Sequence, residues 1–373
     1  MKPKQFYNLF RQSWKSKLFR LTSYLCLSII CLSLSVSIYS IYVKSKKSLI
    51  YHDEVIYNRE SSKIKKRREK INAAMGWGFN FSQSWIQEAT KAGDVIFRAK
   101  ITIDEFGRRI VPNNTLNLNQ RKKHLIITGG SYVLSQNVDD QDTFTNLIAE
   151  VLDDHHIYVY GGWWYSPAHF LRRFEVAPIT QEIKQDSGLT LVVFNKAHLL
   201  GILGDSCYLV HENNFHSPSF EMKSNKLVYA GKWSEIFEKR YRVMRNLPNL
   251  LQNIYTEYCW NFLESKYHNL DEILGEYTRE QMNLIFNVFK AYKNILEKQL
   301  PKTKVIFLNM NWGKKPPSKF INAAKEYQLQ VKSIEMDNLN TDLNPDTWHL
   351  NSEGEKGLAK LILPVIYDSM DAE

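Results

Sequence analysis

The chain has 373 residues, of which 44% are hydrophobic and 24% charged, and its formal net charge is +10. This composition is that of an ordinary globular protein and excludes a chain that is disordered over most of its length. The excess of positive charge is typical of proteins that bind nucleic acid or a membrane surface, and its distribution along the chain favours the membrane.

The first predicted element is a transmembrane helix over residues 21–43, preceded by a basic tail over 1–20. The stretch has no charged residue in 23 positions, enough at about 1.5 Å per residue to cross a hydrocarbon core of about 30 Å. A buried core helix and a cleaved signal peptide are the alternatives. Both flanks are basic, and the charges lean slightly toward a cytoplasmic N-terminus, which would place the rest of the chain on the periplasmic face.

Residues 44–95 follow as a predicted basic stalk or linker. The run KIKKRREK over 63–70 predicts a solvated helix attracted to anionic lipid headgroups. Because no aromatic residue interrupts the run, we expect no nucleic-acid partner. Beyond the predicted membrane segment, Cys207 and Cys259 could form a disulfide or remain free thiols.

From residue 96 to 373, short apolar runs alternate with amphipathic segments, which predicts an α/β domain with a doubly wound parallel sheet and flanking helices. The expected strands are buried runs rich in Ile, Val and Leu at 124–128, 156–161, 189–194 and 304–309. The expected helices cover 143–152, 167–174, 233–246, 250–265, 279–299 and 318–327. The residues from 206 to 300 are expected to form a helical insertion that acts as a cap or one wall of a site.

Two motifs lie at opposite ends of this domain. In TGGSYV (128–133), two glycines follow the first strand and allow a sharp turn, so Ser131 would lie at a strand end as an exposed nucleophilic hydroxyl. In DTWHLNSEGEKGLAKLI, Asp346 precedes His349 by three residues. Ser352 and Glu355 have capping-box spacing, so a last helix is expected to begin at Ser352 and to leave the acid and the histidine on the loop before it.

This order of motifs resembles the SGNH (GDSL-type) hydrolase family, whose nucleophile is in the first block and whose D-x-x-H motif is in the last. Further matches are DTFTNLIAEVL (142–152) after the nucleophile turn, YGGWWYSPAHFL (160–171) as a second block, and ITIDEFGRRIVP (101–112) as the lead-in segment of membrane-associated members. The resemblance covers roughly 96–368. It implies a flavodoxin-like sheet and hydrolysis of ester bonds.

The resemblance implies a catalytic triad of Ser131, His349 and Asp346. A serine hydroxyl must lose its proton as it attacks an ester, and His349 would accept that proton as general base. Asp346 would fix the imidazole tautomer and stabilise the imidazolium that forms. No cofactor is required for this chemistry, and the sequence has no metal-ligand spacing, phosphate-binding loop or dinucleotide motif.

The resemblance also implies an oxyanion hole with one donor from each of three blocks. Ser131 would contribute its own backbone N–H. In the second block, Trp164 stands where the family has its donor glycine, and Gly162 would serve after a slip of register. In the third block NKAHLL replaces the family's Gly-x-Asn-Asp, which leaves Asn195 or His198 as a side-chain donor.

The first block departs from the family as well, because Gly130 stands where an aspartate is usual. Trp163, Trp164 and Tyr165 could form a flat surface for a sugar ring, and packing in the core or at an interface is the alternative. The departures in the three blocks keep a non-catalytic binding module open.

The sequence therefore predicts a membrane-anchored SGNH-type serine esterase that acts through an acyl-serine intermediate. The expected partner is an acyl or acetyl ester on an envelope glycan or lipid. An O-acyltransferase with the same triad is the first alternative, and a non-catalytic envelope binding or assembly module with a degenerate hydrolase fold is the second.

Overall fold

The computed structural model describes residues 33, 50–58, 60–91, 93–116, 118–205, 208–209, 216–238, 278–311, 318–339 and 349–370. Contacts divide the chain into two compact units, residues 1–51 with 89–96, and residues 52–88 with 97–373. Nearly all described residues of the first unit lie at the ends of strands. The second unit contains the main sheet and every site residue discussed below.

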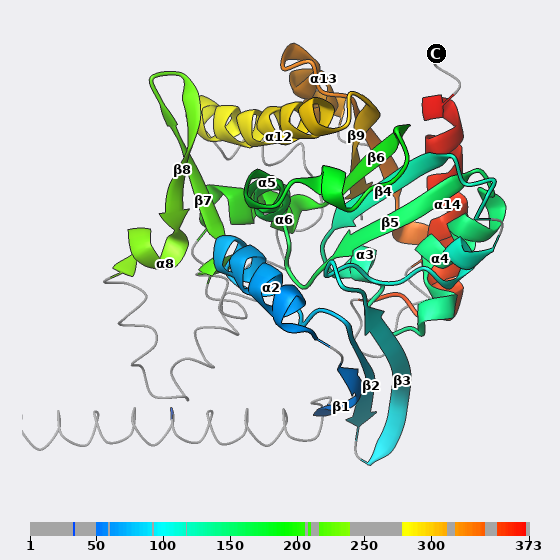
Figure 1. The fold of residues 1–373 in the computed structure, drawn as a ribbon. Helices are drawn as coiled ribbons and strands as arrows, with labels where there is room; N and C mark the ends of the chain where they lie inside the picture. The colour runs from blue at the N-terminus through cyan, green and yellow to red at the C-terminus, as the bar shows by residue number, and fades with distance from the viewer. Residues whose placement is uncertain are drawn as a thin grey trace, which may run out of the picture. The chain divides into compact units, whose positions relative to one another are not determined.

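The main sheet has five parallel strands in the order β10-β9-β6-β4-β5 (Figure 1). The strands are β4 (Lys123–Gly129), β5 (His155–Gly161), β6 (Ser187–Phe194), β9 (Lys302–Asn311) and β10 (Val331–Glu335). Numbered along the chain this is the flavodoxin-like order 2-1-3-4-5, so the direction of winding reverses at β4. The predicted parallel α/β sheet is confirmed, and β10 is a strand that the prediction missed.

Helices cover both faces of this sheet (Figure 1). Along β4, Ile126 faces one hydrophobic cluster whereas Leu125 and Ile127 face the other, because successive side chains of a strand point to opposite faces. The helices of the first cluster include α5 (Pro167–Val176), α6 (Lys196–Leu203), α12 (Arg279–Gln299) and α13 (Ser318–Glu326). Those of the second include α4 (Phe144–Val151) and α14 (Ser352–Met370).

The expected insertion over 206–300 is smaller than predicted, because its last part belongs to the domain itself. Helix α12 leads directly into β9, and its Ile285, Phe289 and Tyr292 are completely buried. Before it lie an antiparallel hairpin of β7 (Pro218–Lys223) and β8 (Lys226–Lys232) and a short helix α8 (Trp233–Ile236). The predicted helix at 250–265 and most of the one at 233–246 lie outside the described residues.

The basic run expected in a solvated stalk is part of a packed helix. Helix α2 (Ser62–Met75) packs against α5, and its Ile71 and Met75 are each 2% exposed. Arg67 forms an ion pair with the fully buried carboxylate of Glu182. Helix α2 is part of the second unit, although it lies within the range 44–95 over which a linker was expected. Strands β1 (Ile50–Asn58), β2 (Gln83–Lys91) and β3 (Asp94–Ile103) form a three-stranded sheet.

No helix within the described ranges is both long enough and apolar enough to span a membrane. The span expected at 21–43 lies outside those ranges except for Ser33, and Cys207 and Cys259 lie outside them as well.

Candidate active site

Ser131 is the first residue of a short helix, α3 (Ser131–Leu134), directly beyond the carboxyl end of β4. The connection is a single residue, Gly130, which lies at the N-cap position. A side chain on Gly129 would place its Cβ 2.6 Å from Val133 Cγ2, so the close return of the helix over the strand requires glycine there. The structure thus places Ser131 where ligands bind in doubly wound sheets, at the strand where the order reverses.

The turn that follows α3 is held by Arg109, which the sequence gave no reason to single out. Its Nη1 donates to the carbonyl oxygens of Leu134 and Ser135, at 2.5 Å each, and its Nη2 donates to Val138 at 2.6 Å. Its Nε donates to a carboxylate oxygen of Asp140 at 3.1 Å. A buried guanidinium therefore satisfies the carbonyls at the end of the nucleophile helix.

His349 lies beside the nucleophile turn. Its imidazole ring is 5.7 Å from the ring of Tyr132, centroid to centroid, and Tyr132 is the residue after Ser131. Helix α14 begins at Ser352 as predicted and leaves His349 on the preceding loop. The structure therefore places His349 against the residue that follows Ser131. Asp346 lies outside the described residues, and the triad stays a prediction.

The predicted capping box of Ser352 and Glu355 is wrong. The side chain of Asn351 accepts from the backbone N–H of Gly354 at 2.9 Å and fills that role. Glu355 instead points into the core, where its Oε2 accepts from the backbone N–H of Phe144 at 2.7 Å and from the hydroxyl of Ser135 at 2.8 Å.

Burial raises the pKa of Glu355 to about 7, although these hydrogen bonds and the charge of Arg109 act in the opposite direction. The carboxyl group joins the first turn of α14 to the turn after α3. Glu355 thus connects the two segments that carry Ser131 and His349.

In the second block, Gly162 is excluded as an oxyanion donor because its N–H donates to the carbonyl of Gly129 at 3.2 Å. Trp164 has a φ of +57°, a conformation that disfavours residues with a Cβ by about 1–2 kcal/mol. Its carbonyl accepts from the hydroxyl of the buried Tyr208 at 2.7 Å. The position where the resemblance places a glycine thus has a backbone conformation that favours glycine.

In the third block, Asn195 and His198 cap α6 reciprocally. The Asn195 side chain accepts from the backbone N–H of His198 at 3.3 Å, and Nδ1 of His198 accepts from the backbone N–H of Asn195 at 3.1 Å. Burial lowers the pKa of His198 to about 4, so its imidazole is neutral at pH 7. Asn195 is therefore engaged as a helix cap, whereas the far edge of the His198 ring faces Gly130.

A second histidine, His169, has the same arrangement at the start of α5, and the sequence analysis missed it. Its Nδ1 accepts from the N–H of Ser166 at 3.0 Å, and burial together with His198 lowers its pKa to about 3. The signal was the shared spacing of a capping residue and a histidine three positions later, in SPAH and in NKAH.

Of the three aromatic side chains predicted to form a sugar-binding surface, Tyr165 is buried and the two tryptophans are half-buried. Tyr165 is 5% exposed, and its hydroxyl donates to the carbonyl of Trp77 at 2.9 Å. Trp163 is half-buried, and its ring packs edge-on against Phe79 with centroids 5.1 Å apart. Trp164 is half-buried and lies edge-on to Tyr208. The contacts of Trp163 and Tyr165 agree with the alternative that these side chains pack in the core.

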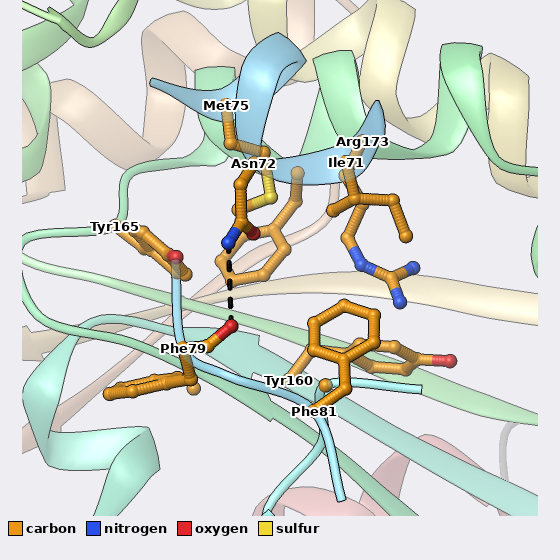
Figure 2. Close-up of a pocket in the computed structure, with 11 residues that line it drawn as sticks. Ile71, Asn72, Met75, Phe79, Phe81, Tyr160, Tyr165 and Arg173 are labelled. Atoms are coloured by element: carbon orange, nitrogen blue, oxygen red, sulfur yellow. Dashed lines mark hydrogen bonds between the residues drawn. The ribbon is translucent and has the colours of Figure 1, made fainter. Parts of the chain in front are cut away.

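The pocket beside these residues is too small for a substrate. Figure 2 shows Asn72, Tyr160, Tyr165 and Arg173 around it, with the Asn72 amide donating to the Phe79 carbonyl at 3.3 Å. Its volume is about 20 Å³, room for about one water molecule. Within the described ranges, no group of three or more His, Cys, Asp or Glu side chains is placed to hold a metal ion.

No family model and no curated protein matches this chain. Among solved structures, the psychrotrophic esterase EstA from a Pseudoalteromonas species has a TM-score of 0.36 and 9% identity, over 67% of this chain and 99% of its own. A carbohydrate esterase family 2 enzyme from Corynascus thermopiles has 0.37 and 11%, over 67% of each chain. The acetyl xylan esterase Est2A from the rumen bacterium Butyrivibrio proteoclasticus has 0.36 and 10%, over 67% and 64%. TM-scores below 0.5 at these identities support no conclusion about this chain.

Proposed function

We propose that the protein hydrolyses acyl or acetyl esters through an acyl-Ser131 intermediate. The observation that carries this proposal is the position of Ser131, at the carboxyl end of the strand where the sheet order reverses, with the His349 ring against its neighbour Tyr132. This position supports the proposal, because acyl transfer requires a serine nucleophile and a histidine base near each other.

In this reaction the Ser131 oxygen attacks the ester carbonyl carbon while His349 accepts the hydroxyl proton. The carbonyl oxygen carries the negative charge until the bond to the alcohol breaks, and His349 returns the proton to the departing alcohol. Water then attacks the acyl-serine with His349 as base, which releases the carboxylic acid and restores the hydroxyl. Asp346 is assigned the role of orienting the imidazole, on the basis of the D-x-x-H spacing.

The proposed substrate class is an acyl or acetyl ester on an envelope glycan or lipid. The uncharged run at 21–43 supports it, because a membrane anchor would hold the enzyme beside such esters. Activity on soluble small esters with none on envelope material would contradict this substrate class and leave the reaction type intact.

The test of the reaction is the intact mass of the full chain, purified in detergent, after treatment with a fluorophosphonate that modifies activated serines. The expected result is one adduct per chain, absent from Ser131→Ala. Ser318→Ala is a matched control, because Ser318 is also the first residue of a helix but is exposed. A folded chain that forms no adduct would contradict the proposal and favour a non-catalytic binding module.

A further inference from the structure

The first block departs from the family pattern at Gly130, and the third block has His198 near the family's asparagine position. These two residues lie next to each other in the structure. We infer that His198 is a catalytic residue that donates its Nε2–H to the oxyanion formed at Ser131; this rests on the proposed function. A histidine side chain would then supply the donor that the resemblance assigns to an asparagine.

The hydrogen bonds of His198 fix the tautomer of its imidazole. Nδ1 of His198 accepts a hydrogen bond from the backbone N–H of Asn195 at 3.1 Å, so Nδ1 has a lone pair rather than a proton. In a neutral imidazole the other nitrogen must then be protonated. Within the described part of the chain, no hydrogen bond engages Nε2. His198 therefore presents a fixed N–H donor that has no partner among these residues.

The Nε2–H donor of His198 lies beside Gly130. A Cβ built on Gly130 would lie 2.5 Å from Nε2 of His198. Adding one carbon–carbon bond of about 1.5 Å places Nε2 within about 4 Å of Gly130 Cα. Gly130 is bonded to Ser131, whose own N–H is the other donor at this turn. Nε2 of His198 thus lies next to the turn that carries the backbone N–H of Ser131.

Two other candidate oxyanion donors already take part in hydrogen bonds. The N–H of Gly162 is bonded to the Gly129 carbonyl, and the Asn195 side chain caps α6. The imidazole of His198 is held on two sides, by this cap and by burial that leaves it 7% exposed. A donor held in place before the reaction stabilises developing charge without reorganisation.

The residue at position 130 and the residue at position 198 are in contact, so the two departures from the family pattern are linked. The aspartate that the family has at position 130 has a Cβ, which would collide with the His198 ring. A glycine at 130 therefore leaves room for the ring of His198, whereas an aspartate there would not.

The experiment compares His198→Gln with His198→Glu in the full chain. Both residues can accept from the Asn195 N–H and so preserve the cap of α6, but of the two only glutamine retains a side-chain donor. We measure kcat and KM on a p-nitrophenyl ester, and the melting temperature of each variant as the control for folding.

We expect His198→Glu to lower kcat about 100-fold to 1,000-fold with little change in KM, and His198→Gln to lower it less than tenfold. Equal values of kcat in the two variants and the unmodified protein would overturn the inference while leaving the esterase proposal intact. Absence of Ser131-dependent turnover in the unmodified protein would instead overturn the proposed function.

Discussion

At the scale of single residues, the site depends on a glycine whose role is steric rather than conformational. Gly130 has a φ of −76° and a ψ of −153°, a conformation open to any residue. Of the three atoms nearest to an added Cβ, two are Nε2 and Cε1 of His198, at 2.5 and 2.9 Å, and the third is at an ordinary contact distance of 3.5 Å. A methyl group here would therefore move one side chain and leave the backbone unstrained.

Gly130→Ala is expected to lower kcat at least tenfold, because the new methyl group displaces the His198 ring from its position beside Ser131. The effect should be much smaller when His198 is already alanine, since no ring is then left to displace. Steady-state kinetics of the two single variants and the double variant test this. Equal and additive losses would show that Gly130 acts independently of His198.

Glu355 gives the stability of the protein a specific pH dependence. Its pKa is raised from 4.5 to about 7 in the folded chain, so between these values the folded state binds more protons than the unfolded state. Stability should then fall as pH rises from about 4.5 to about 7, by about 3 kcal/mol, and change little above that range from this group.

Glu355→Gln should remove this decline. A single oxygen of Glu355 accepts both hydrogen bonds, so a glutamine can keep them with no charge at any pH. Urea unfolding of both proteins at pH 5 and pH 8 measures the difference. The prediction is contradicted if the variant loses as much stability between the two pH values as the unmodified protein does.

At the scale of elements, the sequence predicted the helices and strands whose hydrophobic pattern is visible in a short stretch of residues. The helix expected at 279–299 is α12 with the same bounds, because an apolar stripe with 3.6-residue spacing is visible in the sequence alone. The hairpin of β7 and β8 and the short helix α3 were missed, since short elements depend on tertiary contacts more than on periodicity. The charged run in α2 concealed Ile71 and Met75, which share the buried face four residues apart.

Ile71→Ala is expected to lower the free energy of unfolding by about 2–5 kcal/mol, because it removes buried methyl groups and leaves a cavity between α2 and α5. Ile56→Ala is the matched control, since Ile56 is 51% exposed and should change stability by less than about 0.5 kcal/mol. Chemical denaturation of both variants measures these values. Equally small changes in the free energy of unfolding in both variants would indicate that α2 is a solvated stalk.

At the scale of the whole molecule, chain order predicted more of the site than its local motifs did. Alternating strands and helices predicted a parallel sheet, and the glycine turn after the first strand predicted Ser131 at a strand end. His349 lies against Tyr132, the neighbour of Ser131. The contact between Gly130 and His198 could not be predicted, because it joins the start of α3 to the start of α6, 68 residues apart in the sequence. Nor could the inward turn of Glu355, since capping boxes and buried carboxylates share one sequence pattern.

The assignment of α2 to the second unit has a testable consequence for the extent of the domain. The second unit begins at His52 and includes α2. A fragment of residues 97–373 is therefore expected to unfold at lower temperature than one of residues 52–373, because it lacks the helix that covers Tyr165 and Phe170. Differential scanning calorimetry compares the two fragments. Equal melting temperatures would support the shorter domain.

The most direct test of an acyl-Ser131 intermediate is the pre-steady-state release of p-nitrophenol from p-nitrophenyl acetate by the full chain. Formation of an acyl-enzyme that then hydrolyses more slowly predicts a rapid burst of about one p-nitrophenol per chain, followed by slower turnover. The burst should be absent from Ser131→Ala and unchanged in Ser318→Ala. Turnover that persists unaltered in Ser131→Ala would contradict the assignment of Ser131 as the nucleophile.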